Sequence, residues 1–187
     1  MFDNGWNLQW FEDRLKGREA TFRCVSEICK KTECQTVLDV GGGIGLLRRF
    51  LPTDIKHDVV DLSSKAKQFG EKLFPDVRFI TGTIDNIVDE YDAIIAIWVV
   101  EHMNDYESFL KTAWNRANKI IVISFGNGLD DNERIKKRFR NYWNNKYSFP
   151  KLESFINTEL HPVRMEVIKI DVIRDYSPEL ILVLYKE

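Results

Sequence analysis

Hydrophobic positions along the chain follow two spacings, and their alternation predicts a sheet whose strands are separated by helices. Between Tyr106 and Ala117, apolar side chains recur at i, i+3, i+4, i+7 and i+8, the spacing of an amphipathic helix. The run from Tyr91 to Trp98 is apolar at almost every position, as expected for a strand covered on both faces. The predicted helices span residues 8–31, 46–51, 64–74, 106–117, 130–144 and 151–160. The predicted strands span residues 36–40, 57–61, 77–81, 91–98, 119–125, 165–173 and 180–186.

The order of these elements predicts a single α/β domain. Strands and helices alternate up to the fifth strand, which favours a parallel sheet. Arg174–Pro178, between the last two strands, is too short for a crossover helix, so these strands are predicted to form an antiparallel hairpin. No repeat or linker divides residues 1–187. Asn104, three residues before Glu107, is predicted to start the helix at 106–117 with a capping-box-like contact.

Composition and charge exclude several classes of protein. Of 187 residues, 44% are hydrophobic, and 27 Lys and Arg nearly balance 29 Asp and Glu, which argues against a disordered chain or a polybasic binder of membranes. The apolar run Ala93–Val100 is too short to span a bilayer, and the start lacks the pattern of a secretory signal. A cytoplasmic protein is expected, with Cys24, Cys29 and Cys34 as reduced, mostly packing residues.

The turn after the first strand is the most informative stretch of the sequence. Glycines stand at positions 41, 42, 43 and 45, between a strand and a predicted helix. Such a turn lets a ligand approach the backbone, and amide groups at the helix start point toward it. The dinucleotide pattern G-x-G-x-x-G fails because Leu46 and Arg48 stand where its third glycine would be, and no Gly-Lys-Ser/Thr follows as in a P-loop. A tight connection without a ligand is the structural alternative.

Asp39-Val40-Gly41-Gly42-Gly43-Ile44-Gly45 resembles the first motif of class I S-adenosylmethionine-dependent methyltransferases, and three later segments agree in order. Asp61 ends the second strand, residues 82–87 follow the third, and residues 91–103 are similar to the fourth motif of the small-molecule members, with their Glu-His pair. The resemblance covers residues 36–125 closely. It implies a Rossmann-like sheet with helices on both faces and an antiparallel C-terminal strand.

The resemblance also implies the reaction. S-adenosyl-L-methionine would be the methyl donor and S-adenosyl-L-homocysteine the product, with transfer to oxygen or nitrogen of a small-molecule or glycan-like acceptor. A cofactor-binding or regulatory subunit without catalysis is the alternative. No metal site is predicted, and the sequence does not determine the oligomeric state.

The resemblance assigns the cofactor to residues at the carboxyl ends of the first four strands. Asp61 would accept hydrogen bonds from the ribose hydroxyls. Many relatives carry an acid where Thr83 stands, so Thr83 or Asp85 would bind adenine here. As alternatives, Asp61 and Asp85 could be ordinary helix caps. The full set of expected cofactor residues is Asp39, Gly41, Gly42, Gly43, Gly45, Asp61, Leu62, Thr83, Ile84, Asp85, Ile97 and Trp98.

Topology selects one of the three histidines as a catalytic candidate. Ligands of such sheets bind beyond the carboxyl ends of the parallel strands, which is where His102 lies, whereas His57 and His161 belong to the opposite edge. Imidazole titrates near neutral pH, so His102 could remove a proton from a hydroxyl acceptor. Alternatively it packs or caps the next helix. Glu101 is a weaker candidate, since a backbone role fits its position equally well.

Residues 126–160 are predicted to lie on the acceptor side, with Trp143 as a substrate contact. Tyr176, in the last hairpin, is a second. The segment is basic and aromatic, which favours an anionic acceptor unless its charges merely form a solvated helix face; nucleic acid is disfavoured because no binding module accompanies it. Its basic residues are Arg134, Lys136, Lys137, Arg138, Arg140 and Lys146.

Residues 1–35 are predicted to form a helical cover, with Trp6, Trp10 and Phe11 packed on the sheet. Arg14 and Arg18 are either solvated or reach the cofactor carboxylate.

Overall fold

The computed structural model describes residues 18–103, 105–126, 129, 137–139, 142–170 and 179–186, with only the backbone of residues 137–139, 142 and 143. In this part of the chain a seven-stranded sheet has the order β3-β2-β1-β4-β5-β9-β8. The first five strands in this order are parallel, whereas β9 runs antiparallel to both β5 and β8. The strands are β1 (Thr36–Val40), β2 (Lys56–Asp61), β3 (Arg78–Thr81), β4 (Tyr91–Ile97), β5 (Ala117–Phe125), β8 (Arg164–Ile170) and β9 (Glu179–Tyr185). The fold class predicted from the sequence is confirmed.

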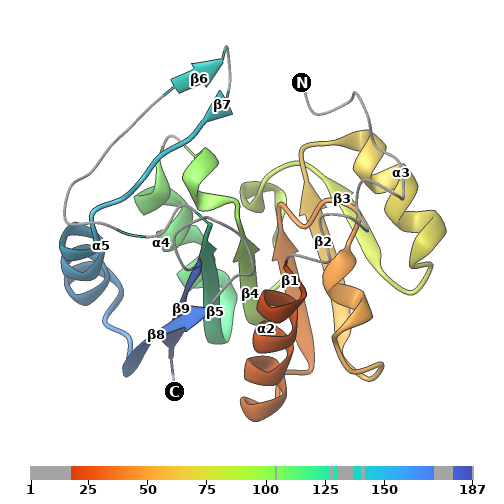
Figure 1. Cartoon of the computed structure of the whole chain (residues 1–187). Coiled ribbons are helices and arrows are strands. Elements are labelled where there is room, and N and C mark those ends of the chain that lie inside the picture. Colours follow the sequence, from red (N-terminus) through yellow and green to blue (C-terminus); the bar gives the residue numbers. More distant parts are fainter. Residues whose placement is uncertain are drawn as a thin grey trace.

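Helices cover both faces of the sheet (Figure 1). On one face, α2 (Glu19–Lys31) buries Phe22, Val25 and Cys29 against β1, β4, β5 and β9. On the other, α4 (Tyr106–Arg116) and α5 (Phe149–Phe155) pack Leu110 and Leu152 over the same strands. The remaining helical elements are α3 (Ser64–Leu73), the 3₁₀ turns η1 (Leu46–Arg49), η2 (Ile84–Asn86) and η3 (Val100–His102), and the π-helical η4 (Ile156–Leu160).

Two predicted helices differ from the structure. The helix predicted at 46–51 is the short 3₁₀ turn η1, which begins after the left-handed Gly45 and is followed by Pro52, a residue that cannot donate a helical N–H. The helix predicted at 130–144 is wrong where the chain is described. There β6 (Lys137–Phe139) and β7 (Tyr142–Trp143) pair antiparallel. Aromatic residues favour strands, and helical spacing in so short a stretch does not exclude a hairpin.

The start of α4 also corrects the sequence prediction. The N-cap is Asp105, whose Oδ1 accepts a hydrogen bond from the Ser108 N–H at 2.9 Å, and not Asn104, which lies outside the described residues. The helix predicted at 151–160 is confirmed as α5 continued by η4. None of the described helices is long and apolar enough to cross a membrane. The three cysteines carry free thiols.

Candidate functional site

The glycine turn links β1 to η1 at the carboxyl edge of the sheet. Gly41, Gly43 and Gly45 have φ of 67°, 59° and 78°, in the left-handed region where a side chain is strained. A Cβ at Gly41 would lie 2.5 Å from Val99 Cγ2, and one at Gly42 would lie 2.4 Å from Asp39 Oδ2. Gly41 and Gly42 are therefore required by packing inside the protein, whether or not a ligand binds.

Asp61, at the end of β2, connects the glycine turn to the strand beside it. Its Oδ2 accepts a hydrogen bond from the Gly43 N–H at 3.0 Å, and its Oδ1 accepts one from the Ser63 N–H at 2.8 Å. A carboxylate can accept about four hydrogen bonds, so positions remain for the two hydroxyls of a ribose. Burial raises the pKa of Asp61, although both N–H groups act in the opposite direction. The N-cap of α3 is Ser63, so Asp61 is not an ordinary helix cap.

The expected adenine segment forms a closed turn around η2. Thr83 is the N-cap, with a reciprocal capping box to Asn86, so Asp85 is not the cap. The Thr83 hydroxyl donates to Asp85 Oδ2 at 3.1 Å, and both side chains are exposed. Ile84 is buried in the core, which leaves its backbone as the part that could meet a ligand. Leu62, beside Asp61, is 65% exposed and offers apolar surface at the same edge.

Asp39 lies beneath the glycine turn and not on its outer side. The residue is 2% exposed, and its Oδ2 is 3.7 Å from Nε2 of the buried His57. Burial raises the pKa of Asp39, while His57 acts to lower it. Asp39 is therefore placed to support the turn, with Gly42 packed directly on its carboxylate.

At the end of β4, Ile97 is buried and the next residue turns the chain. Trp98 has φ of 55°, a strained value for a large side chain, and its backbone N–H donates to Ser124 Oγ at 3.2 Å. Its ring lies edge-on to Phe22, and the Arg18 guanidinium stacks 4.0 Å from the ring centroid. Arg18 is thus not merely solvated, because its guanidinium packs on the Trp98 ring.

The Glu-His pair lies in η3, directly after this turn. Glu101 is buried, and its Oε1 accepts from the Gly126 N–H at 2.8 Å, which joins the ends of β4 and β5. This is the backbone role that the sequence allowed for Glu101. His102 is half-buried, and its backbone N–H donates to the carbonyl of Val99 at 2.9 Å.

Residues 145–147 hydrogen-bond to η3 and its C-cap Met103, and they belong to the predicted acceptor-side stretch 126–160, called the substrate-side segment below. The Asn145 N–H donates to the Glu101 carbonyl at 2.8 Å, and the Tyr147 hydroxyl lies 3.1 Å and 3.0 Å from the carbonyls of Val100 and Met103. The segment therefore lies beside His102, at the edge of the sheet where ligands bind. The sequence indicated the segment but not these two residues.

Several predicted residues lie outside the described part of the chain, and one buried acid was missed. Trp6, Trp10, Phe11, Arg14 and Tyr176 are outside it, and Trp143 is described only by its backbone in β7. The missed acid is Glu179, which is 3% exposed at the start of β9. The available signal was an acid directly before the apolar run 180–184.

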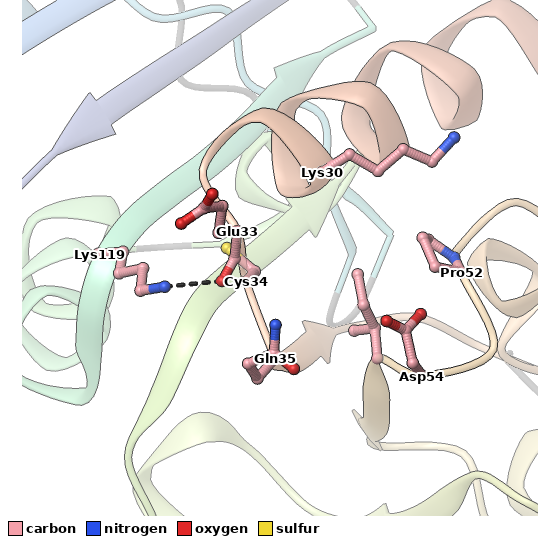
Figure 2. A pocket seen from close by; sticks show the side chains of 8 residues that line it. Lys30, Glu33, Cys34, Gln35, Pro52, Asp54 and Lys119 are labelled. Carbon is pink, nitrogen blue, oxygen red and sulfur yellow. Dashed lines mark hydrogen bonds between the residues drawn. The ribbon is translucent and has the colours of Figure 1, made fainter.

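A hollow of about 430 Å³ lies at the opposite, amino edge of the sheet (Figure 2). The Lys119 ammonium there donates to the carbonyl of Glu33 at 2.7 Å, and Lys30 pairs with Glu27. Its lysines are thus engaged, and it lies away from the edge where ligands of such sheets bind. Among the described residues no group of three His, Cys, Asp or Glu side chains could hold a metal ion.

Comparison with known proteins finds similarity in one family and one fold. The family model of the methyltransferase domain matches residues 38–118. No curated protein matches the sequence. The N1-methyltransferase for 1,6-didemethyltoxoflavin from Burkholderia thailandensis, crystallised with that compound and S-adenosylhomocysteine, is 18% identical, with 90% of this chain and 79% of that chain covered and a TM-score of 0.72.

Two further structures are similar at this level. The magnesium protoporphyrin IX methyltransferase of Synechocystis PCC 6803, with bound S-adenosylmethionine, is 14% identical, with 100% and 88% of the two chains covered and a TM-score of 0.69. The N-terminal domain of EvdMO1, in the presence of S-adenosylhomocysteine and D-fucose, is 11% identical, with 90% and 84% covered and a TM-score of 0.70. At these identities the structures establish the fold.

Proposed function

We propose that this chain, whose residues 38–118 match the model of the methyltransferase domain, is a class I S-adenosylmethionine-dependent methyltransferase. It transfers the methyl group to an oxygen or nitrogen of a small-molecule or glycan-like acceptor. The observation that carries this proposal is the joining of Gly43 and Asp61, which brings a backbone turn and an ionisable acceptor together at the ends of β1 and β2.

S-adenosyl-L-methionine supplies an already activated methyl group. This chain therefore has to bind the cofactor, orient the acceptor and exclude water. In the proposal, the remaining lone pairs of Asp61 receive the ribose hydroxyls, Leu62 lies against adenine, and Thr83 with Asp85 meets its polar edge. Gly43, with its left-handed backbone, lets the chain approach the cofactor closely. Asp39, Gly41, Gly42 and Gly45 shape the turn.

His102 is proposed to remove the proton when the acceptor is a hydroxyl. Its place in η3, beside the substrate-side segment held by Asn145 and Tyr147, supports this role. Trp143 and Tyr176 stay proposed acceptor contacts. An anionic acceptor, suggested by the basic residues of the same segment, also stays a prediction, since most of those residues lie outside the described part.

The similar structures support a small-molecule acceptor without selecting one. Their names give 1,6-didemethyltoxoflavin and magnesium protoporphyrin IX, which have little in common chemically. Nucleic acid is not proposed as an acceptor, because the chain is nearly charge-balanced.

Two measurements test the proposed function. Calorimetry with S-adenosylmethionine and with NAD should give binding of the first and none of the second. An assay for S-adenosylhomocysteine release over a metabolite panel should then give turnover with at least one acceptor. Binding of NAD alone would contradict the proposal, whereas cofactor binding with no release over a broad panel would favour a non-catalytic subunit.

A further inference from the structure

Two buried acids come together at the acceptor side of the proposed site. Glu101 follows β4 in η3, and Glu179 opens β9. Because Leu180 pairs with Phe125 across the antiparallel ladder, Glu179 lies level with Gly126, whose N–H binds Glu101. Each acid is only 3% exposed. The sheet thus brings two carboxylates to the edge where ligands of this architecture bind.

Each carboxylate has one satisfied and one unsatisfied oxygen. Glu101 Oε1 accepts from Gly126, and Glu179 Oε2 accepts from the Thr21 hydroxyl at 2.7 Å. Glu101 Oε2 and Glu179 Oε1 are buried without a hydrogen-bond partner in the structure of the described residues. Unpaired buried carboxylate oxygens are costly, and such atoms usually have a donor in the working state of a protein.

The charges around these acids do not balance. Burial raises the pKa of both acids, and Glu179 adds to the increase for Glu101. Arg18, stacked on Trp98, acts in the opposite direction on both. The neutral side chains of Ser124 and Trp98 also act to lower the pKa of Glu179, but neither carries a charge and neither completes a hydrogen bond to Oε1. When both acids are ionised, one cation faces two anions among the residues that the structure describes. Within the described part of the chain, the cluster of Glu101, Glu179 and Arg18 is therefore one positive charge short of neutrality.

We propose that the acceptor supplies this charge, and that its recognised group is a protonated amine held by Glu179 and Glu101 beside Trp98. The inference rests on the proposed function and narrows its acceptor class. It stands against the anionic acceptor predicted from the basic segment, and the test below compares the two. An ammonium group offers three donors, which suits two unpaired oxygens. A phosphate or carboxylate would meet two negative charges in a poorly solvated place, which is strongly unfavourable.

The test measures binding by ligand-observed NMR to protein saturated with S-adenosylhomocysteine. The probes are pairs of similar shape: phenethylamine with 3-phenylpropionate, and tryptamine with indole-3-propionate. The amines should bind and the acids should not. In Glu179→Gln, which can still accept from Thr21, amine affinity should fall about tenfold or more, since a hydrogen bond to a charged group is lost.

Glu166→Gln is the matched control. Glu166 is also a strand glutamate that accepts one hydroxyl bond, from Tyr185 at 2.9 Å, but it lies on β8 away from the cluster. Its variant should bind the amines as the parent does. Glu101→Gln, whose amide oxygen can still accept from Gly126, provides a second variant should Glu179→Gln unfold more readily.

Several outcomes would overturn the amine assignment. They are equal or stronger binding of the acids, no binding by any probe, or unchanged amine affinity in folded Glu179→Gln. Weaker S-adenosylmethionine binding in that variant with unchanged amine binding would assign the acids to the cofactor and also reject the proposal. If S-adenosylhomocysteine does not bind the parent, the proposed function fails. The comparison of amine and carboxylate probes can still be made on the free protein, and it then tests Glu101 and Glu179 independently of the cofactor.

Discussion

Asp61 holds the glycine turn and also offers free lone pairs, so its removal should affect the cofactor more than the fold. Asp61→Ala is expected to weaken S-adenosylmethionine binding by about 1.5–3 kcal/mol, because ribose hydroxyls lose a charged acceptor. Calorimetric titration of the parent and the variant measures this difference.

Asp92 provides the control for Asp61. Its Oδ2 also accepts two backbone N–H groups, from Gln35 at 2.6 Å and Thr36 at 3.2 Å, but at the amino edge of the sheet. Asp92→Ala should lower stability with cofactor affinity unchanged. Equal cofactor binding by folded Asp61→Ala and parent would mean that Asp61 does not hold the ribose.

A second prediction at the scale of single residues concerns Gly43. Gly43→Val should bind the cofactor more weakly than Asp61→Ala does, because a branched side chain at a φ of 59° is strained and would occupy space beside the ligand. Since strain alone could unfold the turn, the measurement is calorimetry on protein whose thermal unfolding remains cooperative. Tight binding by such protein would exclude close approach of the cofactor at Gly43.

For His102 the kinetic and structural roles predict different results. If it removes a proton from a hydroxyl acceptor, His102→Gln should lower turnover by roughly 10²–10⁴-fold with cofactor affinity nearly unchanged. The parent rate should rise as pH increases through the neutral range, where imidazole loses its proton. Measuring turnover against pH for the parent and His102→Gln on one identified acceptor distinguishes the two roles. Superimposable profiles would remove His102 from the chemistry, without affecting the methyltransferase assignment.

At the scale of elements, α4 depends on one side chain for its start. Asp105→Ala should destabilise the protein by about 1 kcal/mol, since the Ser108 N–H loses its acceptor and the first turn loses a favourable negative charge. Chemical denaturation measures the free energy of unfolding. Asn104→Ala, at the start predicted from the sequence, is the comparison. A larger loss in that variant would contradict Asp105 as the cap.

At the scale of the whole molecule, the carboxyl edge of the sheet gathers acids whose pKa is raised by burial. These are Asp39, Asp61, Glu101 and Glu179. A carboxyl whose pKa is higher in the folded than in the unfolded state binds protons more tightly when folded. Its contribution to stability is therefore full at low pH and is lost as pH rises through the folded pKa.

Glu179→Gln tests this dependence on pH. Relative to the variant, the parent should lose stability as pH rises above 4.5, the ordinary pKa of the glutamate side chain. Asp89→Asn should give the opposite trend, because Arg78 lowers the pKa of Asp89, so that this acid stabilises the parent once pH exceeds 3.8. Denaturation of the three proteins from acid to neutral pH provides the comparison. Parallel curves for parent and Glu179→Gln would show that burial of Glu179 carries no such cost.

The sequence by itself determined the sheet, its antiparallel end and the edge that carries the proposed site. Apolar runs at 36–40 and 91–98 are local signals, and the order of such runs restricts the topology to few arrangements. The glycine turn and Asp61 follow each other within one crossover, so their meeting could also be predicted. Local signals failed where the same spacing of apolar residues fits either a helix or a pair of strands. This is the case between β6 and β7, where a hairpin replaces the expected helix.

Only the tertiary structure decided which side chains stabilise the fold and which are accessible to a ligand at the proposed site. Asp39 lies one residue before the end of β1 and Asp61 ends β2, yet Asp39 is buried against His57 and Asp61 is partly exposed beside Gly43. Glu101 and Glu179 lie 78 positions apart along the chain and reach the same edge of the sheet because β9 returns antiparallel beside β5. Burial and the pairing of unlike segments depend on three-dimensional packing, and a linear pattern of residues carries neither.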